Sequence, residues 1–103
     1  MKIFLTGGTG FIGSNFLNCA LKQNISITAI KRKNSKPSIE LEKYPNWITG
    51  EMSQDWSKEL KKCSIFIHMA SYGVIDNYDD WEKCFEVNVN QSLNLWRQAI
   101  RSG

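Results

Sequence analysis

The sequence predicts an α/β fold, in which helices cover a doubly wound parallel sheet. Two observations support this prediction. Short apolar runs typical of buried strands alternate along the chain with longer segments whose apolar residues recur every three or four positions, as in helices. The first apolar run, residues 2–6, leads directly into a glycine-rich stretch at 7–13 and then into a helix. Right-handed crossovers give the strand order 3-2-1-4, by analogy with other doubly wound sheets.

Each element follows from its own pattern. Helix 11–23 is indicated by Ile12, Phe16 and Ala20, which recur every four residues and form one apolar face. The loop 32–45 contains both prolines and is expected to be irregular and exposed. In chain order, the predicted strands are 2–6, 25–31, 46–50 and 64–70, and the predicted helices are 11–23, 55–62 and 80–101.

The last predicted helix carries an apolar stripe whose members are three or four residues apart. This spacing places them on one helix face, and we expect that face to be part of the core. The stripe consists of Trp81, Phe85, Val89, Leu93, Trp96 and Ile100.

The composition fits one small globular domain. With 42% hydrophobic and 22% charged residues, the chain resembles ordinary folded proteins rather than disordered ones. A net charge of +3 is too small to predict a nucleic-acid partner, and no apolar run is long enough to cross a membrane. Nothing after Met1 resembles a signal peptide, so we expect a cytoplasmic protein. The three cysteines lack zinc-site or disulfide-framework spacing and are expected to be buried thiols.

The glycine-rich stretch fits a phosphate-binding turn in two registers. Residues 8–13 match G-x-G-x-x-G, and Gly7, Gly10 and Gly13 match G-x-x-G-x-x-G. Glycines adopt turn angles that other residues resist and place no Cβ beside a ligand, so a pyrophosphate can lie against the N–H groups that open the helix. The expected contacts are Gly7, Gly10, Phe11, Ile12 and Gly13. The alternative is a tight turn that binds nothing.

Three segments together carry a family resemblance. Residues 1–13, 63–71 and 86–95 resemble the extended short-chain dehydrogenases, and more narrowly the NAD-dependent epimerase/dehydratase family. The resemblance covers nearly the whole chain, and T-G-G-T-G-F-I-G is its most specific piece. It implies that residues 1–103 form the N-terminal portion of a longer chain, with the N-terminal half of a Rossmann-like NAD(P)-binding domain. It also implies a nucleotide-sugar substrate, since members commonly act on such sugars.

Basic residues occupy the position that usually selects the cofactor. In Rossmann sequences an Asp or Glu about 20 residues past the glycines binds the adenosine ribose and selects NAD. Here Lys31, Arg32 and Lys33 follow the second predicted strand. A guanidinium can bind the 2′-phosphate of NADP, so Arg32 predicts NADP, with NAD as the other candidate. Lys33, Asn34 and Ser35 are expected to assist, and the alternative is a solvated basic loop.

The resemblance implies further contacts at the ends of the third and fourth strands. In the family, residues matching Glu51 and Met52 contact the adenine, and those matching Met69, Ala70 and Ser71 line the cofactor. His68 is expected to be structural, Asn88 to brace the fourth strand, and Tyr72 and Gly73 to border the substrate.

The family's catalytic Tyr-x-x-x-Lys is missing. Positions four residues after Tyr44, Tyr72 and Tyr78 hold Ile48, Asp76 and Glu82. We therefore expect no catalytic residue within the chain and no hydride transfer by the chain alone. The alternative function is a non-catalytic dinucleotide-binding sensor or regulatory module. An unpaired apolar edge at the fourth strand would also favour homo-oligomers.

Overall fold

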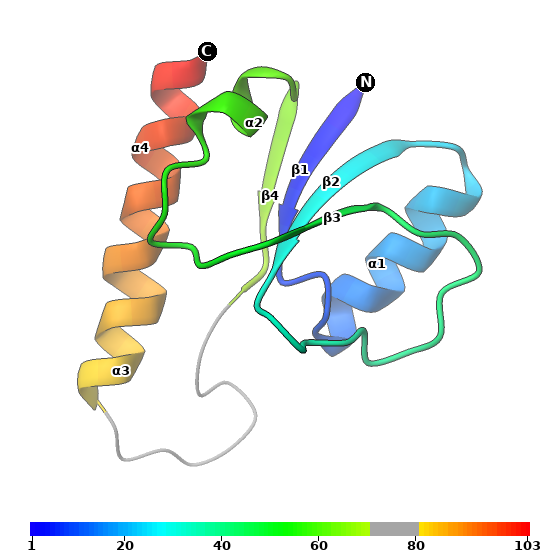
Figure 1. Cartoon of the computed structure of the whole chain (residues 1–103), viewed down its shortest axis with the longest axis horizontal. Coiled ribbons are helices and arrows are strands. Elements are labelled where there is room, and N and C mark those ends of the chain that lie inside the picture. Colours follow the sequence, from blue (N-terminus) through cyan, green and yellow to red (C-terminus); the bar gives the residue numbers. More distant parts are fainter. Residues whose placement is uncertain (71–80) are drawn as a thin grey trace.

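The computed structural model describes residues 1–70 and 81–103 and contains one parallel sheet (Figure 1). Its strands are β1 (Lys2–Thr6), β2 (Ser26–Lys31), β3 (Asn46–Thr49) and β4 (Ile65–His68). Their order is β3-β2-β1-β4, with Ile3 opposite Ile27 on one side and Ile65 on the other. The predicted α/β class and the strand order 3-2-1-4 are confirmed, and every strand lies within its predicted range.

Helices cover both faces of this sheet because side chains alternate along each strand. α1 (Phe11–Lys22) packs on one face, and α2 (Ser57–Lys61) and α4 (Ser92–Ser102) pack on the other (Figure 1). The α1-side core consists of Ile3, Leu5, Leu17, Ala20, Leu21, Ile27, Ala29 and Leu41. The α4-side core consists of Phe4, Ile30, Trp56, Leu60 and Leu95.

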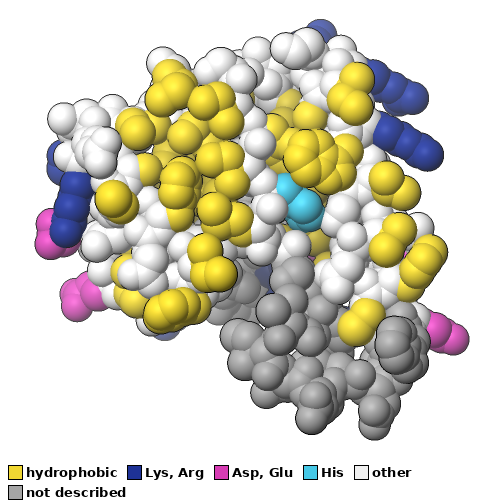
Figure 2. Space-filling model, turned by 180° about the vertical axis from the view of Figure 1, so that it is seen from behind, with side chains coloured by type: hydrophobic (Ala, Val, Ile, Leu, Met, Phe, Trp, Pro, Cys, Tyr) yellow, Lys and Arg dark blue, Asp and Glu magenta, His cyan; other side chains and the backbone are white. Residues whose placement is uncertain are grey.

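The C-terminal helical segment buries a different face from the one that the sequence predicts. It consists of α3 (Trp81–Phe85), the π-helix η1 (Glu86–Gln91) and α4. The predicted core stripe is wrong for its described side chains, which are 38–77% exposed: Phe85, Val89, Leu93, Trp96 and Ile100. Ser92 and Leu95 face the sheet instead. Figure 2 shows apolar side chains at the surface over a large part of one face of the molecule. The apolar spacing therefore identified a helix correctly but not the side that packs on the sheet.

Two further expectations concern the burial of the cysteines and the absence of a membrane-spanning segment. Cys19 is exposed, so the expected burial is wrong there, whereas Cys63 and Cys84 are half-buried. All three are free thiols. None of the described helices has the length and apolar content needed to cross a membrane.

The outer edge of β4 carries the first testable prediction. Within the described ranges, β4 pairs with β1 alone, and Ile65 is 38% exposed. Because unpaired strand edges template further pairing, we expect the 103-residue chain to self-associate as its concentration rises. Ile65→Lys places a charge at this edge and should shift the chain toward the monomer. Sedimentation velocity checks both; a parent that stays monomeric at high concentration would contradict the prediction.

Candidate functional site

The segments that carry most of the expected site residues follow the carboxyl ends of the strands. All four strands are parallel, so these ends meet at one edge of the sheet. The glycine turn after β1, the basic loop after β2 and the end of β4 lie together at this edge, in the lower part of Figure 1. Ligands of open α/β sheets bind at such carboxyl ends.

Two of the glycines are required by close packing. Gly7 has a φ of +78°, and a Cβ there would lie 2.5 Å from the Ala70 nitrogen. A Cβ on Gly13 would lie 1.9 Å from the Gly7 carbonyl oxygen. These two glycines therefore allow the turn to pack closely on the end of β4, and the start of α1 to pack closely on the turn.

Gly10 is different, because neither its angles nor its neighbours demand glycine. Its φ of −74° and ψ of 173° are open to any residue, which corrects the expectation that the turn needs glycine's angles here. A Cβ would meet nothing nearer than the Gly7 oxygen at 3.4 Å. The space beside Gly10 is therefore open, and it adjoins the start of α1.

The first turn of α1 presents backbone N–H groups and apolar side chains to this open space. An α-helix leaves its first N–H groups without helical acceptors, and the N-cap Gly10 has no side chain to cap them. Phe11 and Ile12 are 67% and 72% exposed. Ile12, at the start of the apolar face predicted for this helix, is thus exposed, whereas Leu17 and Ala20 further along α1 are buried. This helix start can accept an anion with an apolar group beside it.

Ser38 ties the basic loop to the glycine turn. Its N–H and its hydroxyl both donate to the Thr9 carbonyl, at 3.0 and 2.8 Å. The buried Ser14 hydroxyl accepts from the same Ser38 N–H at 3.0 Å and donates to the Gly8 carbonyl at 2.9 Å. Sequence reasoning missed Ser14 and Ser38, because no local pattern marks a serine that bonds across 24 or more residues.

The basic residues open this loop as a tight turn. Asn34 is left-handed, with a φ of +68°, and the Ser35 N–H donates to the Arg32 carbonyl at 3.1 Å. The Lys31 ammonium donates to the Ser35 carbonyl at 3.0 Å. Arg32 and Lys33 are exposed, and no carboxylate of the described residues forms an ion pair with Arg32. The guanidinium is thus available to a ligand anion.

Glu51 and Met52, in the turn after β3, differ in burial. The Glu51 N–H donates to the Gln54 side chain at 2.5 Å, and its carbonyl accepts from the Trp56 indole at 2.9 Å. Its carboxylate side chain is exposed. Met52 is half-buried against the α4-side core, and its carbonyl accepts from Asn94 at 2.9 Å. Met52 therefore packs as a core residue, and any contact with a ligand ring would use its remaining exposed surface.

The end of β4 is held by the buried Thr6. The Thr6 hydroxyl oxygen accepts from the N–H groups of Met69 and Ala70, both at 3.2 Å. The same hydroxyl lies 2.5 Å from His68 Nδ1, and His68 Nε2 lies 2.7 Å from the Ser92 hydroxyl. His68 is thus built into the structure, in agreement with its expected structural role. Burial lowers the pKa of His68 from its usual 6.5.

Four of the expected residues remain untested. Ser71, Tyr72 and Gly73 lie outside the described residues. Asn88 is exposed on η1, where its expected bracing role remains untested.

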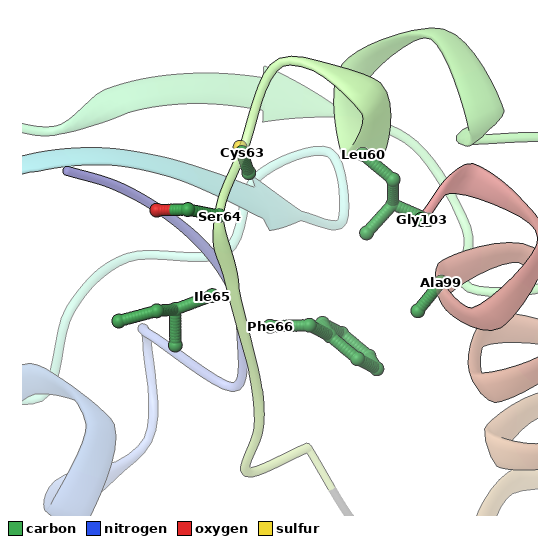
Figure 3. Close-up of a pocket in the computed structure, with 7 residues that line it drawn as sticks. All are labelled: Leu60, Cys63, Ser64, Ile65, Phe66, Ala99 and Gly103. Atoms are coloured by element: carbon green, nitrogen blue, oxygen red, sulfur yellow. The ribbon is translucent and has the colours of Figure 1, made fainter.

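A small cavity lies near the start of β4, at the opposite end of the strands from the glycine turn. It measures about 70 Å³ and is lined by Leu60, Cys63, Ser64, Ile65, Phe66, Ala99 and Gly103 (Figure 3). Phe66 points toward Ala99 of α4 in this view, and Ser64 precedes β4. Burial raises the pKa of the Cys63 thiol, which makes it a weaker nucleophile. This cavity therefore belongs to the packing of α2 and α4 and not to the candidate site.

Comparison with known proteins places this arrangement in context. The NAD dependent epimerase/dehydratase family matches residues 3–103. The chain is 29% identical to a putative dihydroflavonol 4-reductase of Synechocystis sp., covering 97% of this chain and 29% of that protein. It is 32% identical to a ketoreductase of Cercospora nicotianae, covering 98% of this chain and 33% of the relative.

A solved structure confirms the fold. The UDP-glucose 4-epimerase of Thermus thermophilus, determined with NAD, superposes with a TM-score of 0.82 at 20% identity. The superposition covers 100% of this chain and 35% of that one. The chain thus spans about a third of the length of the relatives that it matches.

Proposed function

Because the chain belongs to the NAD dependent epimerase/dehydratase family, we propose that it is the cofactor-binding portion of a longer epimerase, dehydratase or reductase. One observation carries the proposal: the glycine turn is packed against the end of β4 while the space beside Gly10 stays open. A helix start with open space beside its N-cap, free of any Cβ, is what an anion-binding turn needs. A pyrophosphate fits that space, against the first N–H groups of α1.

We propose that the remaining expected contacts come from the segments that follow the other strands. The Ser38 bonds bring the basic loop to the turn, with Arg32, Lys33 and Ser35 at its start. The backbone of Met69 and Ala70 borders Gly7 from the other side. Glu51 and Met52, at the end of β3, are proposed to contact the adenine. When bound, the dinucleotide would supply hydride chemistry, and these residues would hold and orient it.

We further propose that the cofactor is NADP, with NAD as the alternative. Arg32 is exposed and pairs with no described carboxylate, so it is suited to a 2′-phosphate. A charge-assisted pair of this kind favours NADPH over NADH by roughly ten- to hundredfold. The solved relative of Thermus thermophilus was determined with NAD, so the preference rests on Arg32 itself. Raised salt should shrink the preference, because the site is exposed.

Arg32→Asp tests this preference. The change removes the guanidinium and adds a charge that repels the 2′-phosphate, so the preference should reverse toward NADH while the NADH affinity changes little. Calorimetric titrations of both dinucleotides at matched ionic strength measure it. Lys22→Asp, on the far end of α1, is a control with the same charge change. Equal NADPH and NADH affinities in the parent would sink the NADP assignment.

The substrate proposal is a nucleotide sugar, bound by the longer protein. The name of the Thermus thermophilus relative, a UDP-glucose 4-epimerase, supports this class. A curated relative named CDP-abequose synthase supports the same class, whereas two others, named putative dihydroflavonol 4-reductase and ketoreductase, favour a ketone without a nucleotide as the second candidate. We expect the 103-residue chain to bind the dinucleotide and to transfer no hydride by itself. The cytoplasmic location also stays a prediction.

Absorbance of NADPH in the presence of either substrate class tests the enzymatic part. Appreciable turnover by the pure 103-residue chain would contradict the proposal that its catalytic residues lie elsewhere. Binding without turnover in a longer chain containing this one would instead favour the sensor or regulatory alternative.

A further inference from the structure

A chain of hydrogen bonds crosses the α4 side of the sheet. It runs from Thr6 on β1 through His68 on β4 to Ser92 at the start of α4, and ends at the Val87 carbonyl of η1, 3.4 Å from the Ser92 hydroxyl. Its first two links are short, at 2.5 and 2.7 Å. Thr6 is fully buried and Ser92 is 9% exposed.

The number of donors around Thr6 determines which atom donates in each of these hydrogen bonds. The Thr6 oxygen already accepts from two backbone N–H groups, those of Met69 and Ala70. Its two lone pairs are therefore occupied, and its hydroxyl hydrogen is left to donate. The acceptor in reach is His68 Nδ1, so this nitrogen carries no proton. A neutral imidazole then carries its proton on Nε2, which donates to Ser92, and Ser92 donates to Val87.

From this assignment of donors we propose that Thr6, neutral His68 and Ser92 are positioning residues that hold the Met69–Ala70 backbone in place at the candidate site. The role at the site rests on the proposed function. Gly7 packs directly on this backbone, since a Cβ there would lie 2.5 Å from both Met69 carbonyl carbon and Ala70 nitrogen. A displacement of the Met69–Ala70 backbone would therefore displace the glycine turn as well.

Protonation of His68 breaks this arrangement. A proton on Nδ1 would face an oxygen whose lone pairs are both in use, so the Thr6 hydroxyl must release Met69 or Ala70 to accept it. The Met69 N–H has a second acceptor, the Thr6 carbonyl at 3.2 Å, whereas Ala70 depends on the hydroxyl. The hydroxyl therefore releases the Met69 N–H, which keeps the Thr6 carbonyl as its acceptor, because releasing Ala70 would leave that amide without one.

The surroundings of the ring favour the neutral form. Phe66 stacks on His68 at 6.0 Å and Trp96 meets it edge-on at 6.2 Å, between ring centroids. In Figure 2 the single histidine, in cyan, lies among apolar side chains. The described side chains that face the ring from β1, β4 and α4 are Thr6, Phe66, Ser92 and Trp96, and none is charged. Because burial lowers the folded pKa of His68 below 6.5, the bonds are intact above pH 6.5 and are lost as the pH falls through the lowered value.

The chain's single histidine makes the tautomer directly measurable. In long-range proton–nitrogen NMR spectra of the 103-residue chain near neutral pH, we expect a protonated Nε2 and a bare Nδ1. Acidification should protonate the ring and speed the amide exchange of Met69 about tenfold relative to its intrinsic rate at that pH, the worth of one lost hydrogen bond. A proton on Nδ1 at neutral pH, or unchanged Met69 exchange after protonation, would overturn the proposal.

Three variants separate positioning from general stability. Thr6→Val removes the hydroxyl and should speed Ala70 exchange and weaken NADPH binding, whereas Thr28→Val, at a buried threonine of β2, should do neither. His68→Gln keeps one donor and one acceptor without titrating, so the acid-induced exchange should disappear. If Ala70 exchange rises in Thr6→Val and NADPH affinity does not change, the positioning role is refuted. The expected tautomer and exchange in a chain that binds no dinucleotide would support the hydrogen-bond chain and count against the proposed function.

Discussion

Gly13→Ala should destabilise the fold severely. The added Cβ would lie 1.9 Å from the Gly7 carbonyl oxygen and 2.7 Å from its carbonyl carbon, and both are backbone atoms in a packed turn. No side-chain rotation relieves such a clash, so the start of α1 must move away from β1. We expect a loss of about 3 kcal/mol or more, a large part of the stability of a small domain.

Urea denaturation monitored by circular dichroism measures this loss. Gly10→Ala is the matched control, because its Cβ would meet a single atom at 3.4 Å and its φ of −74° suits alanine. It should cost about 1 kcal/mol or less, the usual penalty for alanine at an N-cap. Equal stability losses in the two variants would mean that the close approach at Gly13 is not what holds α1 to the turn.

Gly10→Val should abolish dinucleotide binding and leave the fold intact. Valine can adopt the extended angles of Gly10, and the nearest atom to its Cβ lies at 3.4 Å. Its methyl groups would project into the space proposed for the pyrophosphate, beside the first N–H groups of α1. Two charge-assisted hydrogen bonds lost there are worth roughly 3–6 kcal/mol, which corresponds to a fall in affinity of more than about a hundredfold.

Calorimetry with NADPH tests this expectation, and circular dichroism checks that the variant is folded. Cys19→Val places the same side chain at an exposed position two turns further along α1 and should bind as the parent does. A folded Gly10→Val chain that binds NADPH normally would show that no phosphate lies beside Gly10.

The order of elements could be predicted because it is encoded in local patterns. Residues 2–6 and 26–31 are apolar runs, and Leu17, Ala20 and Leu21 recur at helical spacing, so the strand, turn, helix and strand at the N-terminus follow from neighbours within four positions. The glycine turn was predictable for the same reason. Its place at the carboxyl edge follows from parallel pairing alone.

The face that each helix buries was beyond such patterns. The stripe through Leu93 and Trp96 has helical spacing, yet Ser92 and Leu95 face the sheet. Phe66 and Trp56, which come from separate elements, supply the surface against which Leu95 packs. A periodic pattern specifies an apolar face, whereas its burial depends on what the rest of the fold places opposite it.

Which glycines are enclosed and which is open to a ligand also depended on the folded structure. Gly7, Gly10 and Gly13 are equivalent in the motif, but two are enclosed by backbone and Gly10 faces open space. The bonds from Ser38 to Thr9 and from Thr6 to His68 span 29 and 62 residues. Local propensity therefore specifies the strands, the turn and the helices, while contacts between residues far apart in the chain decide which side chains are buried, which bond, and which remain open to a ligand.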